Sequence, residues 1–345
     1  MAVEDIKSEL SKILKQRILL LDGAYGTAIQ QYELKEDSFR GDLLKSHEKP
    51  LLGNNDLLTI TQPHIVSEIH KNYLEAGCDI LSTNTFSSTS VAQADFDTQE
   101  LCEELNQQGA KLARKMADEY STATKPRFVA GSIGPTNRTA SLSPDVNRPG
   151  FRNIYFDELY ESYFEAMKGL VKGGVDIFLI ETIFDTLNAK AAIAAAREIN
   201  AGLTNPKPII VSGTITDASG RTLSGQTAQA FLTSVAHSEA LAIGFNCALG
   251  AEQLRPYIQE LASHCDTAIS IFPNAGLPNA FGEYEQTPEQ MAEIITEFTE
   301  SGWINIVGGC CGTTPDHIRA ISEVIQNKTP REIALKSDSL KLSGL

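Results

Sequence analysis

Two adjacent cysteines, Cys310 and Cys311, are the residues of this sequence best suited to chemistry. They lie in the stretch INIVGGCCGTTP, after a short apolar run, with glycines on both sides. Neighbouring side chains of a regular strand point to opposite faces, so the pair shares one ligand only where the strand has ended and glycine lets the chain turn. A third cysteine, Cys247, follows another apolar run, in AIGFNCALG. Three thiolates without a fourth predict a zinc ion that keeps one coordination position for a substrate.

The cysteines also have less specific interpretations. Cys247 alone is typical of a buried core thiol, and an adjacent cysteine pair is either inert or forms a strained disulfide that acts as a redox switch. The glycine flanks and the position of both segments after apolar runs favour zinc. The other cysteines are predicted to be packing or surface thiols without a role: Cys78, Cys102 and Cys265.

A zinc ion held by three thiolates favours one kind of reaction. A free thiol has a pKa of about 8.5 and is mostly protonated at neutral pH, whereas zinc removes the proton. The negative charge of the thiolates keeps a bound substrate sulfur nucleophilic and makes the ion a poor activator of water. The site is therefore predicted to alkylate a substrate thiol rather than to hydrolyse a bond.

Further polar residues follow other apolar runs. Glu181 comes directly after IFLI and suits a substrate ammonium group, although a structural charge is the alternative. Asp22, Gly23 and Ala24 are predicted to form a tight turn whose backbone N–H groups suit a carboxylate; a structural role for Asp22 is the alternative. The substrate is thus predicted to be a small amino-acid thiol.

Two asparagines complete the candidate site. Asn274 ends an apolar run between those of the cysteines, and its amide oxygen is a candidate for the fourth zinc position before substrate arrives. Asn246 precedes Cys247 and is expected to point to the opposite face of a regular strand, where it bonds the substrate or a neighbouring strand.

Eight short apolar runs, each followed by a helical stretch, are expected to position these residues. The predicted strands are Ile18–Leu21, Ile80–Thr83, Phe128–Gly131, Ile177–Ile180, Ile209–Ser212, Ala242–Phe245, Ala268–Ile271 and Asn305–Val307. The predicted helices include 64–76, 98–120, 157–173, 186–200, 226–236, 251–263, 288–300 and 315–326. Uniformly apolar strands that alternate with helices predict a parallel sheet covered on both faces. Eight such units predict a single-domain α/β fold, the (β/α)₈ TIM barrel.

The runner-up fold is a doubly wound open sheet, which usually carries a glycine-rich phosphate loop after its first strand. The corresponding segment here, DGAYGT, lacks that spacing. In a barrel the active site lies at the carboxyl ends of the strands, where every predicted strand delivers polar residues; the fifth leads to Asp217. We expect residues 1–16 to form a helix packed on the barrel, 17–326 the barrel, and 327–345 a loosely packed tail or linker.

Composition restricts the class of protein. The 345 residues are 42% hydrophobic and 21% charged, as in globular proteins, and the net charge of −15 disfavours nucleic-acid and membrane-surface partners. Six scattered cysteines do not form a secreted disulfide framework. The N-terminal segment mixes charged and apolar residues, unlike a signal peptide, and no apolar stretch approaches membrane-spanning length. We therefore expect a cytoplasmic protein.

The sequence resembles the homocysteine-binding domains of cobalamin-dependent methionine synthases, from about Arg17 to the C-terminus. The segments that carry the resemblance are LDGAYGT, GNNDLLTITQP, AGCDILSTNTF, GPTNRTASLSPDVN, IETIFDTLNAK, SGTITDASGRTLSGQT, GFNCALG, PNAGLPNAFGEY and VGGCCGTTP. The wider zinc-dependent homocysteine S-methyltransferase family, with its betaine and S-methylmethionine enzymes, shares mainly the DG, ET, NC and GGCCG elements. One departure is Ala24-Tyr25, where Gly-Met is expected in related sequences.

The resemblance implies a site and a reaction. It implies zinc on Cys247, Cys310 and Cys311, the homocysteine sulfur as a further ligand, the amino group on Glu181, and the carboxylate on the Asp22–Ala24 backbone. The methyl donor would be methylcobalamin, carried by another domain or protein in cis or in trans and recharged from 5-methyltetrahydrofolate. The closing LSGL falls about where a folate-binding domain begins in such enzymes.

Three interpretations of function follow. The first is methyl transfer from methylcobalamin to homocysteine, with the long loops 30–57 and 133–155 and the arginines Arg138, Arg148 and Arg152 as candidates for docking a cobalamin domain. The second is a stand-alone enzyme that uses betaine or S-methylmethionine. The third is a zinc-thiolate redox sensor in which Cys310 and Cys311 close on oxidation.

Overall fold

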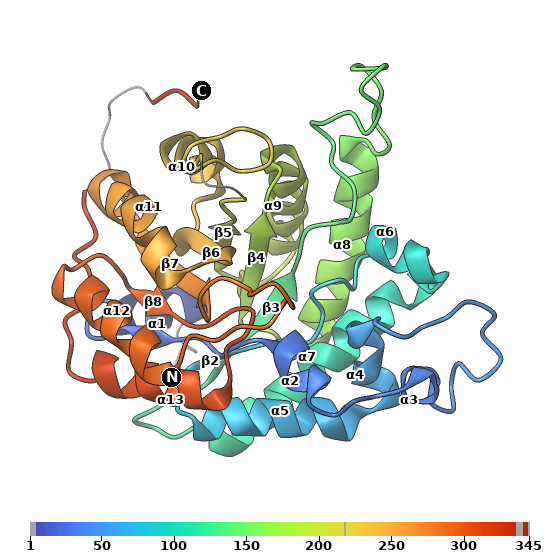
Figure 1. Ribbon diagram of the computed structural model, residues 1–345, viewed down its shortest axis with the longest axis horizontal. Coiled ribbons are helices and arrows are strands. Elements are labelled where there is room, and N and C mark those ends of the chain that lie inside the picture. Colours follow the sequence, from blue (N-terminus) through green and yellow to red (C-terminus); the bar gives the residue numbers. More distant parts are fainter. Residues whose placement is uncertain (1–4, 217–218, 336–340, 344–345) are drawn as a thin grey trace.

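The computed structural model describes residues 5–216, 219–335 and 341–343, so Asp217 lies outside the described residues. Eight parallel strands within these ranges form one sheet in the order β1-β8-β7-β6-β5-β4-β3-β2. A parallel bridge between Leu21 and Ile80 connects β1 with β2 and brings the two edges together. Helices lie between successive strands around this sheet (Figure 1). The predicted (β/α)₈ barrel is confirmed.

The strands are β1 (Leu19–Leu20), β2 (Ile80–Ser82), β3 (Phe128–Ile133), β4 (Ile177–Ile183), β5 (Ile209–Gly213), β6 (Ala242–Gly250), β7 (Ala268–Asn274) and β8 (Ile306–Val307). The main outer helices are α5 (Pro63–Glu75), α7 (Cys102–Tyr120), α8 (Phe156–Gly173), α9 (Thr186–Ala201), α10 (Ala228–Val235), α11 (Ala251–His264), α12 (Pro288–Glu300) and α13 (Pro315–Ile325). Shorter helices are α1 (Ile6–Ile13), α2 (Tyr25–Gln30), α3 (Glu36–Arg40), α4 (Leu58–Thr61) and α6 (Ser90–Gln93). Single 3₁₀ turns are η1 (Asn55–Leu57), η2 (Ala94–Phe96), η3 (Gln99–Leu101) and η4 (Ala236–Ser238).

Several strands run further than predicted at their carboxyl ends. Strands β4 and β6 continue past a shift in register, between Ile180 and Ile183 in β4 and between Asn246 and Gly250 in β6. The apolar residues of these strands end before the backbone hydrogen bonding does. The apolar pattern therefore predicts carboxyl ends that are too early in the sequence. As a result Glu181 and Cys247 lie within strands, beside the irregularities.

Two apolar layers pack against the sheet. Inside the barrel lie side chains such as Ile80, Phe128, Leu179 and Phe272, and the second layer separates strands from helices. Helix α1 adds Leu10 to the inner layer, and Leu14 just beyond that helix does the same; both are buried. The N-terminal helix therefore packs on the barrel.

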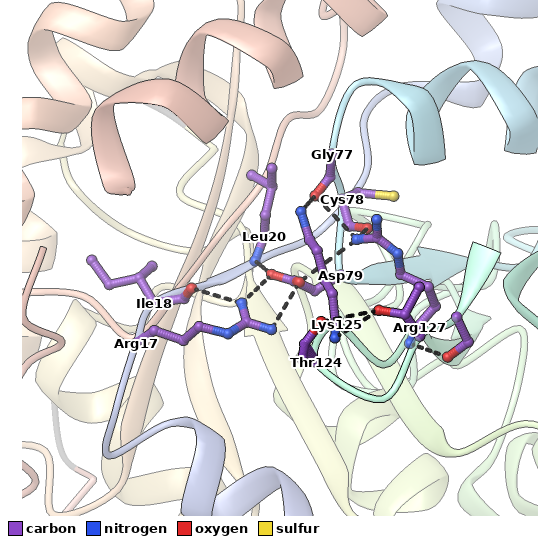
Figure 2. A network of polar contacts seen from close by, with 11 residues as sticks. Arg17, Ile18, Leu20, Gly77, Cys78, Asp79, Thr124, Lys125 and Arg127 are labelled. Atoms are coloured by element: carbon purple, nitrogen blue, oxygen red, sulfur yellow. Dashed lines mark hydrogen bonds and ion pairs between the residues drawn. The ribbon is translucent and has the colours of Figure 1, made fainter. Parts of the chain in front are cut away.

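A polar network holds the amino ends of the first three strands together (Figure 2). Asp79 accepts two hydrogen bonds from Arg17, at 2.7 and 3.0 Å, and one from the backbone N–H of Leu20 at 2.9 Å. Arg127 lies 3.7 Å from the Asp79 carboxylate and donates to backbone carbonyls just before β2. Lys125 also donates to one of these carbonyls. A single carboxylate, 3% exposed, thus ties β1 to β2 and to the segment that leads into β3.

The segment after α13 is packed more tightly than expected of a tail. Arg331 is 6% exposed, and its guanidinium donates to the carbonyls of Ala262, Cys265 and Thr267. Its backbone N–H donates to Ile304. The tail predicted from residue 327 to be loosely packed is thus anchored at Arg331, because an arginine that looks like a surface charge in the sequence satisfies buried carbonyls here.

Replacing Asp79 with alanine is expected to lower the free energy of unfolding by about 3 kcal/mol, because the change leaves a buried guanidinium without its carboxylate. Urea denaturation measures this difference. Asp42→Ala removes a carboxylate from an exposed pair with Lys45 and is expected to leave the free energy of unfolding unchanged within experimental error. Equal stability of Asp79→Ala and Asp42→Ala would contradict the role assigned to the network.

Candidate metal centre and substrate pocket

The three predicted metal ligands converge at the carboxyl end of the barrel. The sulfur atoms of Cys247 and Cys311 are 3.7 Å apart, and all three sulfurs, including that of Cys310, lie within 4.8 Å of one another. A tetrahedral zinc ion with Zn–S bonds of ~2.3 Å requires sulfurs ~3.8 Å apart. The donor set and its spacing therefore fit a zinc ion.

Local backbone conformation, rather than regular strand geometry, turns the thiols toward one another. Cys247 and Ala248 adopt the left-handed region, with φ of 62° and 56°, at the irregularity in β6. Such conformations are rare for residues with a side chain and are found where a site holds the chain in place. The Cys247 side chain is thereby freed from the alternation that a regular strand imposes.

The cysteine pair beyond β8 is held by its neighbour β7. The N–H of Cys310 donates to Pro273, and the N–H of Ala275 donates to the carbonyl of Cys311. Gly312 follows with φ of 80°, and a Cβ at this position would lie 2.3 Å from the Cβ of Tyr284. Only glycine allows the chain to turn there beneath the tyrosine.

The three thiols lose their protons unequally. Hydrogen bonds from Cys247 and Cys310, with a weaker contribution from Tyr284, lower the pKa of Cys311 to about 3. Hydrogen bonds with Cys247 and Cys311, together with burial, raise the pKa of Cys310 well above its ordinary value. A thiolate stabilised by two neighbouring thiols is a site that a divalent cation enters by displacing the remaining protons.

Asn274, the predicted fourth ligand, ends β7 beside the cysteines. Its side chain is buried, and its Oδ1 atom has no hydrogen-bond partner among the described residues. Its Nδ2 atom lies 3.5 Å from the hydroxyl of Tyr284. An unpaired buried oxygen is unfavourable by about 1–3 kcal/mol, so a cation within reach would stabilise it. Its role as a ligand stays a prediction.

A cavity of about 310 Å³ lies over the cysteines, and its lining includes all three of them with Asp22 and Glu181. The carboxylate of Glu181 accepts a hydrogen bond from Ser132 at 2.6 Å. Burial raises the pKa of Glu181 to about 7, and the nearby carboxylate of Asp22 adds to this increase. A buried carboxylate near neutral pKa is stabilised as an anion when a cation binds beside it.

Asn246 supports this carboxylate from behind. Its Oδ1 accepts hydrogen bonds from the N–H of Thr182 and the hydroxyl of Ser212, at 2.9 and 2.6 Å, and its Nδ2 lies 3.4 Å from Glu181. The side chain is fully buried and is not part of the cavity lining. The structure thus places Asn246 where it bonds neighbouring strands; a direct contact with substrate stays a prediction.

The expectation that Asn246 faces away from Cys247 rested on a regular strand, and the strand is irregular. The Nδ2 atom of Asn246 lies 4.0 Å from the sulfur of Cys310, so the amide is on the side of the metal centre. The irregularity in β6 and the left-handed backbone of Thr182, with φ of 55°, bring the two strand ends together there.

The Asp22–Ala24 turn is built as a support and as part of the cavity wall. Asp22 is buried and accepts hydrogen bonds from the backbone N–H and hydroxyl of Ser82. The N–H of Ala24 donates to Thr313, whereas that of Gly23 has no partner among the described residues. A side chain at Gly23 would lie 2.8 Å from the ring of Tyr73. Gly23 is therefore the member of this turn whose N–H is available to a ligand.

Sequence reasoning overlooked several residues of the site. Ser82 ends β2 and bonds Asp22, and Tyr284 lies in the loop after β7 beside Cys311. Asp56 lines the cavity from the segment GNNDLL. Ser82 could have been predicted from its position at the end of a strand. Tyr284 and Asp56 lie in loops, where no periodic pattern predicts which residues face the cavity.

An eight-stranded α/β barrel with three thiols and two buried carboxylates at the carboxyl ends of its strands has the architecture of a metal-dependent barrel enzyme. The sequence matches the family model described as homocysteine S-methyltransferase over residues 19–325. The chain therefore belongs to the homocysteine S-methyltransferase family, and homocysteine is the methyl acceptor that fits this family.

Solved structures agree with the fold. The metallated form of the homocysteine methyltransferase MmuM from Escherichia coli superposes with a TM-score of 0.69 at 21% identity, covering 91% of this chain and 98% of that one. Its apo form gives 0.65 at 20% identity with the same coverage. Within the described residues, every helix is too short or too polar to cross a membrane.

Homocysteine affinity is expected to fall as the pH is lowered through about 7. Glu181 has a pKa of about 7 without ligand, and an ammonium beside it lowers that pKa. The favourable interaction is thus complete above pH 7 and is lost below it, by up to about tenfold per pH unit for one proton. Calorimetric titration across pH 5.5–8.5 on the metal-loaded protein measures this dependence.

Glu181→Gln is expected to weaken binding at pH 8 and to remove one proton from the dependence below pH 7. Glu297→Gln, at an exposed pair with Arg255, is the matched control and is expected to behave like wild type. An unchanged pH dependence in Glu181→Gln would exclude this carboxylate from ammonium binding.

Proposed function

We propose that this chain binds homocysteine, activates its thiol as a zinc thiolate, and accepts a methyl group from methylcobalamin, giving methionine. The donor is carried by another domain or protein and receives its methyl group from 5-methyltetrahydrofolate. The observation that carries the proposal is the convergence of three sulfurs within 4.8 Å in a cavity whose lining also includes Asp22, Asp56 and Glu181.

Each part of homocysteine has a counterpart in the cavity. Cys247, Cys310 and Cys311 hold the zinc ion, which supplies a Lewis acid that lowers the pKa of the substrate thiol. The carboxylates of Glu181 and Asp22 face the ammonium group, and the free N–H of Gly23 faces the substrate carboxylate. The substrate sulfur is then an oriented thiolate close to the mouth of the cavity.

Methyl transfer balances without an acid or a base from the protein. The thiolate lone pair forms the new S–C bond, and the electron pair of the broken bond to the methyl group stays with the donor. The thiol proton has already left when the sulfur binds as a thiolate. The described residues accordingly need only bind, orient and desolvate the sulfur.

A large external donor suits the dimensions of the cavity and its surroundings. A volume of about 310 Å³ is at the small end of ordinary ligand pockets, which suits one amino acid rather than an amino acid and a second large molecule. Phe86 lines the cavity and is 38% exposed, and Phe281, in the loop after β7, is 88% exposed. Exposed aromatic side chains are typical of surfaces that contact another large group. The resemblance of the chain to cobalamin-dependent methionine synthases also supports this donor.

The arginines proposed for docking are largely engaged within their own loop. Arg148 bonds Asp145 at 2.7 Å and lies over the ring of Phe151, 4.4 Å from its centre. Arg152 donates to three backbone carbonyls of the same loop. If the loop docks a donor domain, these arginines support it by shaping the loop.

A small onium donor, such as a sulfonium or betaine, is the second candidate because of Asp56. The Oδ2 atom of this buried carboxylate accepts from Ser87 and Ser88, whereas Oδ1 has no partner among the described residues and is not sealed from the cavity. Phe86 and Phe96 also line the cavity. A free carboxylate oxygen in a cavity with aromatic residues suits an organic cation.

Loss of one thiol tests the metal centre. Wild type is expected to bind one zinc ion per chain and to release protons when homocysteine is added, and Cys310→Ala is expected to lose both properties. Cys265→Ala, which removes a buried thiol at the other end of the barrel, is the matched control. Metal analysis and calorimetry in buffers of different ionisation enthalpy are the measurements. Wild type that ignores both zinc and homocysteine would overturn the proposal.

Donor assays separate the two candidates. Turnover of homocysteine with free methylcobalamin, and none with betaine or S-methylmethionine, is the expected result, with Asp56→Asn close to wild type. The opposite result would be turnover with a small onium donor. If Asp56→Asn then raised the KM of that donor and left the KM of homocysteine constant, the onium compound would replace methylcobalamin as the proposed donor.

A further inference from the structure

A buried hydrogen-bonded chain leads from the cavity to the outer helices. The hydroxyl of Tyr25, in α2, lies 2.9 Å from Oδ2 of Asp22 and 2.7 Å from Nδ1 of His70, in α5. The rings of Tyr25 and His70 also meet edge to face, with their centres 5.4 Å apart. Residues 22–25 and helix α5, which are far apart in the sequence, thus meet at one phenol.

His70 is confined to one role in this chain. Its side chain is fully buried, and its Nε2 atom has no partner among the described residues. Burial lowers the pKa of His70 to about 3, so the imidazole is neutral and carries a single N–H. The position of that proton decides the direction of both hydrogen bonds.

Only one tautomer satisfies all three residues while Asp22 is ionised. With the proton on Nδ1, His70 donates to the oxygen of Tyr25, and the single phenol proton is free to be donated to Asp22. With the proton on Nε2, Tyr25 must donate to His70, and its oxygen lone pairs then face the Asp22 carboxylate. The contact of 2.9 Å between Tyr25 and Asp22 is favourable in the first arrangement and repulsive in the second.

The direction matters for Asp22 because this carboxylate is buried in the cavity wall. Its oxygens accept from the backbone N–H of Ser82 at 2.7 Å, from the Ser82 hydroxyl and from Tyr25. Each of these donors favours the ionised form against the effect of burial. Tyr25 is the donor that comes from outside the strands and the one that a second residue holds in place.

We propose that Tyr25 and His70 are positioning residues that keep Asp22 as an oriented anion, so that Asp22 and Glu181 bind the substrate ammonium together. The inference rests on the proposed function only in requiring an amino-acid thiol as the substrate. Because Met is the residue expected at this position from the resemblance, the contribution is a property of this chain.

Two thiols that differ only in the amino group test the proposal. Homocysteine and its des-amino analogue, 4-sulfanylbutanoate, are titrated calorimetrically into the zinc-loaded full chain. Tyr25→Phe and Tyr25→Met are expected to weaken homocysteine binding about tenfold, as for the loss of one hydrogen bond to a charged group, and to leave the analogue unaffected. Equal weakening of both thiols would reveal a packing role, and unchanged homocysteine affinity would overturn the proposal.

The pH dependence adds a measurement that a packing role would not alter. Asp22 accepts hydrogen bonds from Ser82 and from the ionisable Tyr25, and its charge raises the pKa values of Tyr73, Cys78 and Glu181. Burial places the pKa of Asp22 at about 7 with Tyr25 donating, and loss of that donor raises the pKa further. The acidic decline in homocysteine affinity is therefore expected to begin at higher pH in Tyr25→Phe.

His70 supplies a conservative rescue. His70→Asn retains an N–H donor near the Nδ1 position and is expected to keep most of the affinity, whereas His70→Leu is expected to behave like Tyr25→Phe. Nitrogen-15 spectra of the histidines in the unliganded wild type are expected to show a neutral ring protonated on Nδ1. A ring protonated on Nε2 would overturn the proposal even where a variant fails to fold.

The outcome is separable from that of the proposed function. Failure of the wild-type protein to bind homocysteine with proton release contradicts the proposed function. Binding by wild type together with unselective or absent effects of the Tyr25 variants contradicts only the inference about Tyr25 and His70.

Discussion

The concentration of acidic groups in one poorly solvated cavity is the constraint on which the site depends. Three thiols and three carboxylates, those of Asp22, Asp56 and Glu181, line a space of about 310 Å³, and each becomes an anion when it loses its proton. Burial disfavours every one of these anions, and they disfavour one another. In the proposed function, cations resolve the conflict: a metal ion among the sulfurs and an ammonium group among the carboxylates. Such a site would favour a molecule that carries both a thiol and an amine.

The two ends of the barrel divide stability and function between them. At the amino ends of the strands, a compact ion network around Asp79 joins successive strands with ordinary geometry. At the carboxyl ends, Thr182, Cys247 and Ala248 occupy the left-handed region, which is unfavourable for residues with side chains. The regular packing elsewhere in the barrel holds these strand ends in conformations that they would not adopt alone. Strain near the metal centre is thus tolerated because the rest of the barrel is well packed.

Much of this arrangement could be predicted from the sequence because it depends on patterns of residue type. Uniformly apolar runs that alternate with amphipathic helices predicted the barrel. The glycine-flanked pair, together with Cys247 after another apolar run, predicted the three thiols that converge. The orientation predicted for Asn246 assumed a regular strand, and periodicity cannot detect the shift in strand register that β6 contains. Arg331 was expected in a loose tail because the sequence does not reveal which carbonyls need a donor. Tyr284 and Asp56 lie in irregular segments, where only three-dimensional contacts determine which residues reach the cavity.

The anchoring of Arg331 has a consequence for how a methyl donor reaches the substrate. The arginine binds carbonyls at the start of β7 and before β8, so residue 331 lies at the end of the barrel opposite the cavity. A donor domain joined C-terminal to this residue would have to reach from that end of the barrel to the thiolate at the other. Tether length then sets the local concentration of the donor, which is negligible for a short connection and greatest when the span is matched. The rate of methyl transfer would then depend on the length and stiffness of the linker as well as on the reactivity of the thiolate.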